Sequence, residues 1–402
     1  MKILVLNAGS SSQKSGLYDF SGDSQRASQP LWEAQIDWIP QEGAAEISVE
    51  THNGNSLEET VEVSSRAKTI AYLLSLLHQG PTQVIDSLKA IEAVGHRVVH
   101  GGEAYQNSVV VTEAVKQAIE QLSALAPNHN PANLEGIELM EQLLGDVPQV
   151  AVFDTAFHSR MPLAAIAYPG PYSWLEQGIR RYGFHGISHE YCTRKAAEIL
   201  QKDVKTLRLI VCHLGNGGSL SAVRGGRSID TTMGFTPLDG VMMGTRSGAV
   251  DPGILIHLMR EGMSVDNLDT VLNKSSGLLG VSGVSHDLRA VEKAIAQDNS
   301  QAQLAKDLYL HRLKSCLGAM LMSLGGLDVL VFTAGIGEHS PSVRVAVCES
   351  LSFLGVEIDD DKNSRSPVDV DIATDDSSAR VLVIHTQEDW AIAQACWHCL
   401  RD

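Results

Sequence analysis

The sequence predicts an α/β protein built from two related halves, and three patterns support that prediction. Short apolar runs typical of buried strands alternate with segments of helical period, as in sheets covered by helices. Leu4–Ser12 reads as an apolar strand, a polar residue and a turn of small residues, and Leu209–Ser219 repeats that layout. A chain of 402 residues also exceeds what one hydrophobic core usually fills, so two or three domains are expected.

The expected strands are short, mainly apolar runs bounded by polar residues or glycines. They are Ile3–Leu6, Ala93–Val99, Val150–Phe153, Leu207–His213, Val329–Thr333 and Val381–Ile384. The segment 21–64 differs, because it is polar, contains glycines and places apolar residues at alternate positions near Ile47 and Val61. That alternation predicts an antiparallel β insert.

The expected helices show apolar residues at the spacing of one helix face. Ile70, Leu73, Leu74 and Leu77 have this spacing, and Val115 and Ile119 begin a second such run. Further helices are expected at 133–145, 188–201, 287–297, 301–324, 341–353 and 388–400. Ser340 before Pro341 predicts a cap followed by a first-turn proline.

The composition excludes several classes of protein. Asp and Glu number 48 against 31 Lys and Arg, a net charge of −17 without a block of like charge, which disfavours nucleic-acid or anionic-membrane partners. The first apolar run is too short for a signal peptide, and Ser315–Leu327 is too short for a membrane span. Six scattered cysteines favour a reducing compartment, so we expect a cytoplasmic protein.

Turns of small residues after three predicted strands favour a phosphate-binding function. Backbone N–H groups in Gly9–Ser12 and Gly215–Ser219 can approach phosphate closely because few side chains obstruct them. Lys14 follows the first turn, and Phe332–Glu338 forms the third. The patterns GxxxxGK[ST] and GxGxxG do not occur, which disfavours a P-loop protein and a dinucleotide-binding dehydrogenase.

Two arginines in glycine-flanked segments indicate a second anion. Arg97 and Arg246 could neutralise the equatorial oxygens of a transferring phosphoryl group. A structural alternative for Arg97 is an ion pair with a core carboxylate. Asp154 follows a buried strand at the kind of position where α/β sheets bind ligands, so it could bind a metal, position a nucleophile or cap a turn.

Three further segments carry candidate functional residues. Tyr182–Gly186 places His185 between glycines, as in an exposed functional loop. The proline-bounded loop Ala126–Pro131 contains a histidine that could be a pocket wall or a turn residue. Glu388 and Asp389 begin the last helix, where acidic residues also favour the helix dipole.

Together these motifs closely resemble the acetokinase family, within the superfamily of actin-like, hexokinase-like and heat-shock ATPases. The resemblance covers essentially the whole chain, and GHRVVHGG and HLGNGGS are its most specific motifs. The others are LNAGSSS, FDTAFH, YGFHGISH, MGTRSG, a GIGE turn and the C-terminal acidic pair.

The resemblance implies a fold and a reaction. The fold is two duplicated actin-like (ribonuclease H-like) domains with a nucleotide cleft between them. Residues 1–154 plus 386–402 would form the substrate and metal side, and 155–385 the nucleotide-binding lobe. The reaction is reversible Mg²⁺-dependent transfer of phosphate from ATP to acetate, giving acetyl phosphate and ADP, with Mn²⁺ as a substitute. The family also suggests a homodimer.

By motif, the resemblance implies a role for each of the following residues. Asn7 and Glu388 resemble the family's Mg²⁺ site. Asp154 resembles its catalytic acid, and His185 and Arg246 resemble its transition-state stabilisers. The residues that resemble its substrate contacts are Arg97, Val99, Phe184 and Pro237. The nucleotide site resembles Lys14, His213, Leu214, Gly215, Asn216, Gly217, Asp287, Leu288, Arg289, Gly335, Ile336, Gly337, Glu338 and His339.

The chain departs from the family pattern at three places. Asn128 stands where the family has Leu, which predicts a more polar acyl pocket. Thr386–Asp389 reads TQED rather than TNEE, and Ala249 replaces an acidic residue. A propionate or butyrate kinase of the same family is therefore one alternative, and a nonenzymatic ATPase switch of the actin or chaperone type is another.

Overall fold

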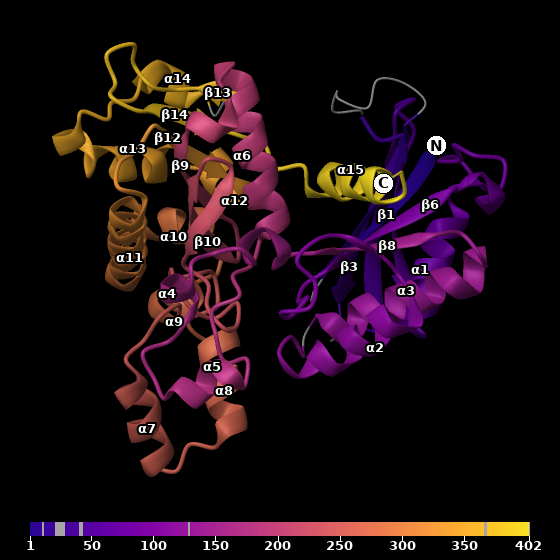
Figure 1. Ribbon diagram of the computed structural model, residues 1–402, viewed down its shortest axis with the longest axis horizontal. Coiled ribbons are helices and arrows are strands. Elements are labelled where there is room, and N and C mark those ends of the chain that lie inside the picture. The colour runs from indigo at the N-terminus through magenta and orange to yellow at the C-terminus, as the bar shows by residue number, and fades with distance from the viewer. Residues whose placement is uncertain (10–11, 21–28, 40–42, 128, 366–367, 402) are drawn as a thin grey trace. The chain divides into compact units, whose positions relative to one another are not determined.

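The computed structural model describes residues 1–9, 12–20, 29–39, 43–127, 129–365 and 368–401, and it consists of two compact units (Figure 1). Unit 1 contains Met1–Ala156 and Gln387–Asp402, and unit 2 contains Phe157–Thr386. The division falls close to the boundaries expected at 154 and 386.

Unit 1 is built on a sheet with the strand order β5-β4-β3-β2-β1-β6-β8-β7. Its strands are β1 (Lys2–Ala8), β2 (Ser12–Asp19), β3 (Trp32–Ile39), β4 (Ala44–Thr51), β5 (Ser56–Glu62), β6 (Ala93–Val98), β7 (Val109–Val110) and β8 (Gln149–Phe153). Strands β1 to β5 pair antiparallel, whereas β6 lies parallel to both β1 and β8. Strands β3, β4 and β5 confirm the predicted antiparallel insert within the described residues.

Helices cover both faces of this sheet. They are α1 (Arg66–Ser75), α2 (Glu113–Gln121), α3 (Asn130–Leu144) and α15 (Glu388–Cys399). Figure 1 shows α15 on one side of the strands and α1, α2 and α3 on the other. Helix α15 packs closely because β6 has a glycine there: a Cβ on Gly95 would lie 2.9 Å from Ile392 Cγ2. The α15 N-terminus thereby reaches the strand ends of unit 1 although it comes from the far end of the chain.

Unit 2 repeats the central strand order of unit 1. Its sheet is β11-β10-β9-β12-β14-β13, made of β9 (Arg208–Leu214), β10 (Gly218–Arg224), β11 (Arg227–Thr231), β12 (Val329–Thr333), β13 (Val370–Asp371) and β14 (Arg380–Val383). Strands β9, β10 and β11 are antiparallel, and β12 is parallel to β9 and β14. The same order and sense occur in β3-β2-β1-β6-β8, which confirms the predicted duplication.

Within the described residues, the helices of unit 2 include seven that the sequence did not predict, α4, α5, α7, α8, α9, α12 and α14. The full set is α4 (Leu163–Ile166), α5 (Tyr172–Glu176), α6 (Gly186–Leu200), α7 (Pro252–Arg260), α8 (Val265–Lys274), α9 (Gly277–Ser282), α10 (Leu288–Ile295), α11 (Ser300–Leu324), α12 (Ala334–His339), α13 (Pro341–Glu349) and α14 (Asp360–Ser364). Figure 1 shows α6 and α11 on opposite sides of the sheet. Among the described helices, none is long and apolar enough to span a membrane.

One local prediction in unit 2 was wrong, and another was confirmed in part. Gly335–His339, expected as a turn, belongs to helix α12. The chain turns sharply at Ala334, whose φ is 65°, and the Glu338 carboxylate accepts the Ala334 N–H at 2.8 Å, which stabilises a short helix despite two glycines. Ser340 occupies the N-cap position of α13 before Pro341, but its side chain does not cap the helix and lies 3.2 Å from Ser342 Oγ.

Candidate active site

Three side chains meet where parallel strands of unit 1 end. Asn7 lies near the end of β1, Arg97 near the end of β6, and Asp154 directly after β8. Because these strands are parallel neighbours, their carboxyl ends lie along one edge of the sheet. Arg97 donates from Nη2 to Asp154 Oδ2 at 2.9 Å and from Nη1 to Asn7 Oδ1 at 3.2 Å. The structure thus joins three of the predicted site residues in one cluster.

Arg97 keeps its charge although it is largely buried. Burial alone would lower the pKa of Arg97, but the neighbouring carboxylates of Asp154, Glu388 and Asp389 raise it above its ordinary value. Asp154 is 1% exposed, and its Oδ2 lies 2.9 Å from Arg97 Nη2. The ion pair predicted as the structural alternative for Arg97 therefore exists. The Nε–H of Arg97 is also buried and has no hydrogen-bond partner among the described residues. A buried donor of this kind is suited to an anionic ligand.

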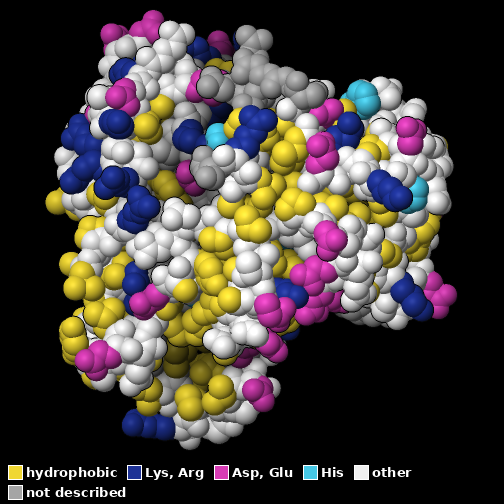
Figure 2. Space-filling view, turned by 45° about the vertical axis from the view of Figure 1, so that its right-hand side comes forward, with side chains coloured by type: hydrophobic (Ala, Val, Ile, Leu, Met, Phe, Trp, Pro, Cys, Tyr) yellow, Lys and Arg dark blue, Asp and Glu magenta, His cyan; other side chains and the backbone are white. Residues whose placement is uncertain are grey.

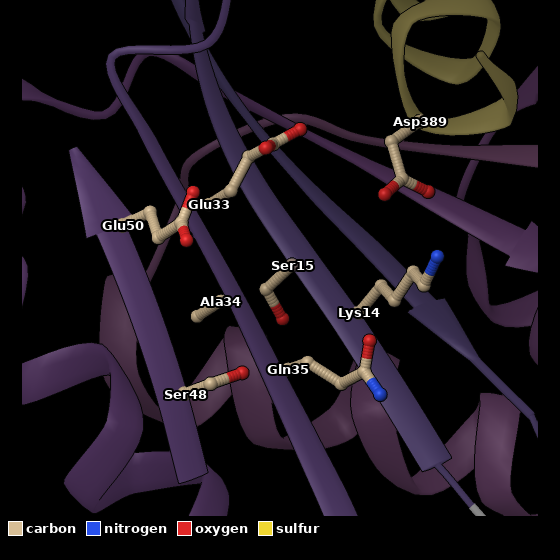
Figure 3. Close-up of a pocket in the computed structure, with 8 residues that line it drawn as sticks. All are labelled: Lys14, Ser15, Glu33, Ala34, Gln35, Ser48, Glu50 and Asp389. Carbon is tan, nitrogen blue, oxygen red and sulfur yellow. The ribbon is translucent and has the colours of Figure 1, made fainter. Parts of the chain in front are cut away.

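The first turn of α15 brings two carboxylates to the same cluster. Asn7 Nδ2 donates to Asp389 Oδ1 at 2.8 Å and contacts Glu388 Oε2 at 3.4 Å. Lys14 lies opposite Asn7 in the β1–β2 hairpin, and Figure 3 shows its side chain directed towards Asp389. Burial raises the pKa of Asp389 to about 6. The motif resemblance assigned only Glu388 of this acidic pair to the metal site, but Asp389 makes the shorter contact with Asn7.

Asp389 also lines a polar pocket on β2, β3 and β4 (Figure 3). The pocket is lined by Lys14, Ser15, Glu33, Ala34, Gln35, Ser48, Glu50 and Asp389. Within the described chain, no group of three or more His, Cys, Asp or Glu side chains is arranged to hold a metal ion. Mg²⁺ commonly takes one or two protein carboxylates and fills its other positions with water and substrate phosphates. The oxygen donors of Glu388 and Asp389 therefore fit Mg²⁺.

In unit 2, two predicted nucleotide segments follow neighbouring parallel strands. His213 pairs with Thr333 in the β9–β12 register, so the turn after β9 and helix α12 start at the same edge. Gly215 N donates to Gly217 O at 2.9 Å and closes the first turn. Glu338 is bound at that edge by the Ala334 N–H and by His385, whose Nδ1 lies 2.7 Å from Oε2.

The third predicted nucleotide segment, Asp287–Arg289, lies close to the same turn. Asp287 caps α10 by accepting the Arg289 N–H at 2.9 Å, and the exposed Arg289 side chain pairs with the Asp287 carboxylate at 2.6 Å. Gly244 N donates to Asn216 O at 2.9 Å, and a Cβ on Gly244 would lie 3.2 Å from His286 O. The residue before Asp287 is therefore near the turn that follows β9.

His185 and Arg246 lie side by side at Gly217. A Cβ on Gly217 would lie 3.3 Å from Arg246 Nη2 and 3.5 Å from His185 Nε2. The His185 ring stacks on the His213 ring with 4.2 Å between centroids. Arg246 Nη1 donates to Pro237 O at 2.8 Å, which orients the guanidinium. Glycine at 217 thus leaves room for two donors next to a backbone turn.

The loop Tyr182–Gly186 is buried, so its prediction as an exposed loop was wrong. Phe184 is 1% exposed, and its carbonyl lies 3.1 Å from His158 Nε2. Gly183 has φ +77° and lies so close to His158 that a Cβ there would overlap the ring. His185 follows with φ 57° at the N-terminus of α6. The tight packing sets the direction of the His185 side chain.

The predicted acyl-pocket residues belong to different units. Val99 is buried in unit 1, where its N–H is bonded to Asn133 Oδ1 at 3.2 Å, whereas Phe184 and Pro237 belong to unit 2. Asn128, which bears on acyl preference, lies outside the described residues, as do Ser10 and Ser11 of the first turn.

Comparisons with known proteins agree with one another. A family model described as "Acetokinase family" matches residues 2–394. The chain is 66% identical to the acetate kinase of Acaryochloris marina over 99% of both chains, and 62% identical to that of Trichormus variabilis over the full length of both. The structure is similar to an acetate kinase of Porphyromonas gingivalis (TM-score 0.90, 40% identity) and to a propionate kinase of Francisella tularensis (TM-score 0.90, 39% identity), each over 99% of both chains.

Proposed function

The chain belongs to the acetokinase family, whose reaction is phosphoryl transfer between ATP and acetate, and we propose that Arg97, His185 and Arg246 carry that transfer here. The match to this family of kinases covers nearly the whole chain, which excludes the alternative of a nonenzymatic ATPase switch. A carboxylate has an ordinary pKa near 4, so the acceptor is already ionised at neutral pH and needs no general base. The difficulty of the reaction is the repulsion between the acceptor and the phosphate donor.

The buried Nε–H of Arg97 is the observation that carries this proposal. Asp154 and Asn7 engage the two Nη atoms, so the guanidinium is held in place while one donor is left for the acceptor carboxylate. Asp154 then acts by orienting Arg97, and it has no need to exchange a proton.

The donors of His185 and Arg246 suit the transferring phosphoryl group. Both approach Gly217 in the turn after β9, where backbone N–H groups can contact phosphate oxygens. Fixed donors of this kind stabilise charge that develops in the transition state, and each is typically worth about 3–4 kcal/mol, roughly 10²–10³ in rate. The nucleotide phosphates are proposed to bind Lys14 and the segments 213–217, 287–289 and 335–339.

Glu388, Asn7 and Asp389 are proposed to hold Mg²⁺, for which Mn²⁺ can substitute. When bound, the ion neutralises charge on the nucleotide phosphates. The support is the pair of carboxylates at the start of α15, Glu388 and Asp389, which lie together beside Asn7.

The acyl preference separates two candidates within the family. The chain is nearly as similar to a solved propionate kinase as to a solved acetate kinase. We propose acetate, because the relatives with the highest identities reported above are acetate kinases. The measurement is kcat/KM with Mg·ATP and formate, acetate, propionate and butyrate, with acyl phosphate trapped as the hydroxamate. A higher kcat/KM for propionate or butyrate than for acetate would support the alternative, and no trapped product from any acid would overturn both.

The protein is also proposed to be a cytoplasmic homodimer. All six cysteines are free thiols, as expected in a reducing compartment. Unit 2 exposes several large apolar side chains that a partner copy would cover, among them Ile254, Ile256 and Met259.

Arg246→Ala tests the assignment in unit 2. We expect kcat to fall at least about 10²-fold, because the variant removes a fixed cation from the phosphoryl group. Arg246→Lys keeps the charge but loses the forked geometry, so it should recover only part of the rate. Near-wild-type turnover of Arg246→Ala would remove Arg246 from the site.

A further inference from the structure

Behind His185, two buried side chains form a hydrogen-bonded chain to which the roles above assign no function. Ser219 lies on β10 and His189 on α6, and both are fully buried. Ser219 Oγ lies 2.9 Å from His185 Nδ1 and 2.7 Å from His189 Nε2. The described residues offer this hydroxyl no other partner. A hydroxyl has one proton, so Ser219 donates to one histidine and accepts from the other.

The environment of His189 decides which atoms donate and which accept in these two hydrogen bonds. Burial, reinforced by the nearby His158 and His213, lowers the pKa of His189 well below its ordinary value, so the ring is neutral and has one N–H. Its Nδ1 is buried and has no hydrogen-bond partner in the described structure. A proton on Nδ1 would be a buried donor without a partner, which is unfavourable. The proton therefore lies on Nε2 and is donated to Ser219.

We infer that Ser219 in turn donates to His185 Nδ1 and so holds the proton of neutral His185 on Nε2. The nitrogen that carries the proton is the one beside Gly217 and Arg246. His185 is then fixed as a hydrogen-bond donor towards a phosphoryl oxygen, and it cannot act there as a base. Ser219 and His189 are positioning residues in this scheme, which rests on the proposed role of His185.

Nitrogen NMR of the whole protein tests the tautomer directly. The ¹⁵N shifts of the two ring nitrogens distinguish the neutral tautomers, and uniform labelling of all 15 histidines is sufficient if the His185 signals are assigned by their loss in His185→Gln. At mildly alkaline pH, where imidazoles are neutral, we expect His185 in the wild-type protein to carry its proton on Nε2. A proton on Nδ1 would overturn the inference.

Two serines on the same face of β10 provide a matched kinetic test. Ser219 and Ser221 are two residues apart and both fully buried, but Ser221 bonds Ser228 and the Asp230 carbonyl and does not contact His185. Ser219→Ala should lower kcat about 10- to 100-fold with the KM for ATP nearly unchanged, as is typical of partners that fix the tautomer of a functional imidazole. Ser221→Ala should leave kcat nearly unchanged. Equal effects of the two variants would contradict the inference.

Variants of His189 give a test that does not depend on Ser219. His189→Gln can still donate an N–H to Ser219, so it should keep the His185 proton on Nε2 and most of the rate, whereas His189→Leu should lose both. If His189→Leu keeps both the Nε2 proton of His185 and the rate, the hydrogen bonds from His189 through Ser219 do not set the tautomer. A protein that phosphorylates no short-chain acid would refute the proposed function alone, because the NMR measurement does not require turnover.

Discussion

At the scale of single residues, Arg97 reconciles two interpretations that its sequence context left open. Its Nη atoms form the structural ion pair and hydrogen bond with Asp154 and Asn7, and its buried Nε–H has no partner among the described residues. The structural contacts would serve the proposed functional one, because they fix the plane of the guanidinium before a ligand arrives.

Removing Arg97 should affect stability and activity in separable ways. Arg97→Ala leaves the Asp154 carboxylate buried without its cation, so we expect a loss of about 3–5 kcal/mol in the free energy of unfolding. Arg97→Ala/Asp154→Asn should recover most of that stability, because the buried charge is gone. Its kcat/KM for the carboxylic acid should stay at least about 10²-fold below wild type.

Denaturant unfolding and steady-state kinetics on the same preparations measure both effects. Recovery of activity together with stability in the double variant would mean that Arg97 only neutralises Asp154 and does not bind the acceptor.

At the scale of elements, the sequence predicts what local pattern determines and misses what distant contacts determine. All six predicted strands exist, because dense apolar runs identify buried strands without knowledge of their neighbours. Helix α12 was missed because two glycines weaken local helix propensity, while its stabilising partner His385 lies 47 residues away from Glu338. Asp389 was not assigned to the metal site because its contact with Asn7 joins residues 382 positions apart, and the helix dipole alone already accounted for an acidic residue there.

The acidic partner of α12 gives a prediction with a defined pH dependence. Burial opposes ionisation of Glu338, but the hydrogen bond and charge of His385 and the N–H groups of Thr386 and Ala334 together lower the pKa of Glu338 below its ordinary value. A lowered folded-state pKa adds stability above the unfolded pKa, and that stability is lost as the pH falls through the folded pKa.

Glu338→Gln should therefore destabilise the protein by about 1–3 kcal/mol at neutral pH and weaken ATP binding. The glutamine amide keeps one acceptor oxygen for the Ala334 N–H, but it carries no charge and its NH₂ group cannot accept a hydrogen bond from His385. The difference in unfolding free energy should shrink as the pH falls below about 4.5. Denaturant unfolding across a pH series measures this, and a difference that is independent of pH would contradict the ionised hydrogen-bonded state.

At the scale of the whole molecule, two opposing features bear on self-association. The net charge of −17 makes copies of the chain repel one another. Against this, unit 2 carries exposed apolar side chains on and around α7, a helix without a fully buried residue. Figure 2 shows hydrophobic side chains gathered at the lower end of the face in view, where α7 and α8 lie in Figure 1. A homodimer that covers α7 would be stabilised by apolar burial and opposed by charge.

This balance predicts how the proposed dimer responds to mutation and to salt. Ile254, Ile256 and Met259 are each about half exposed, so Met259→Glu would bury an unpaired charge in such an interface and should yield monomers in sedimentation equilibrium. Met322→Glu is the control, because Met322 is 80% exposed on α11, outside the α7 surface, and the variant should remain a dimer. Raising the salt concentration should strengthen association of the wild-type protein by screening the repulsion. A dimer that weakens with salt, or that tolerates Met259→Glu, would instead be held by ion pairs or by another surface.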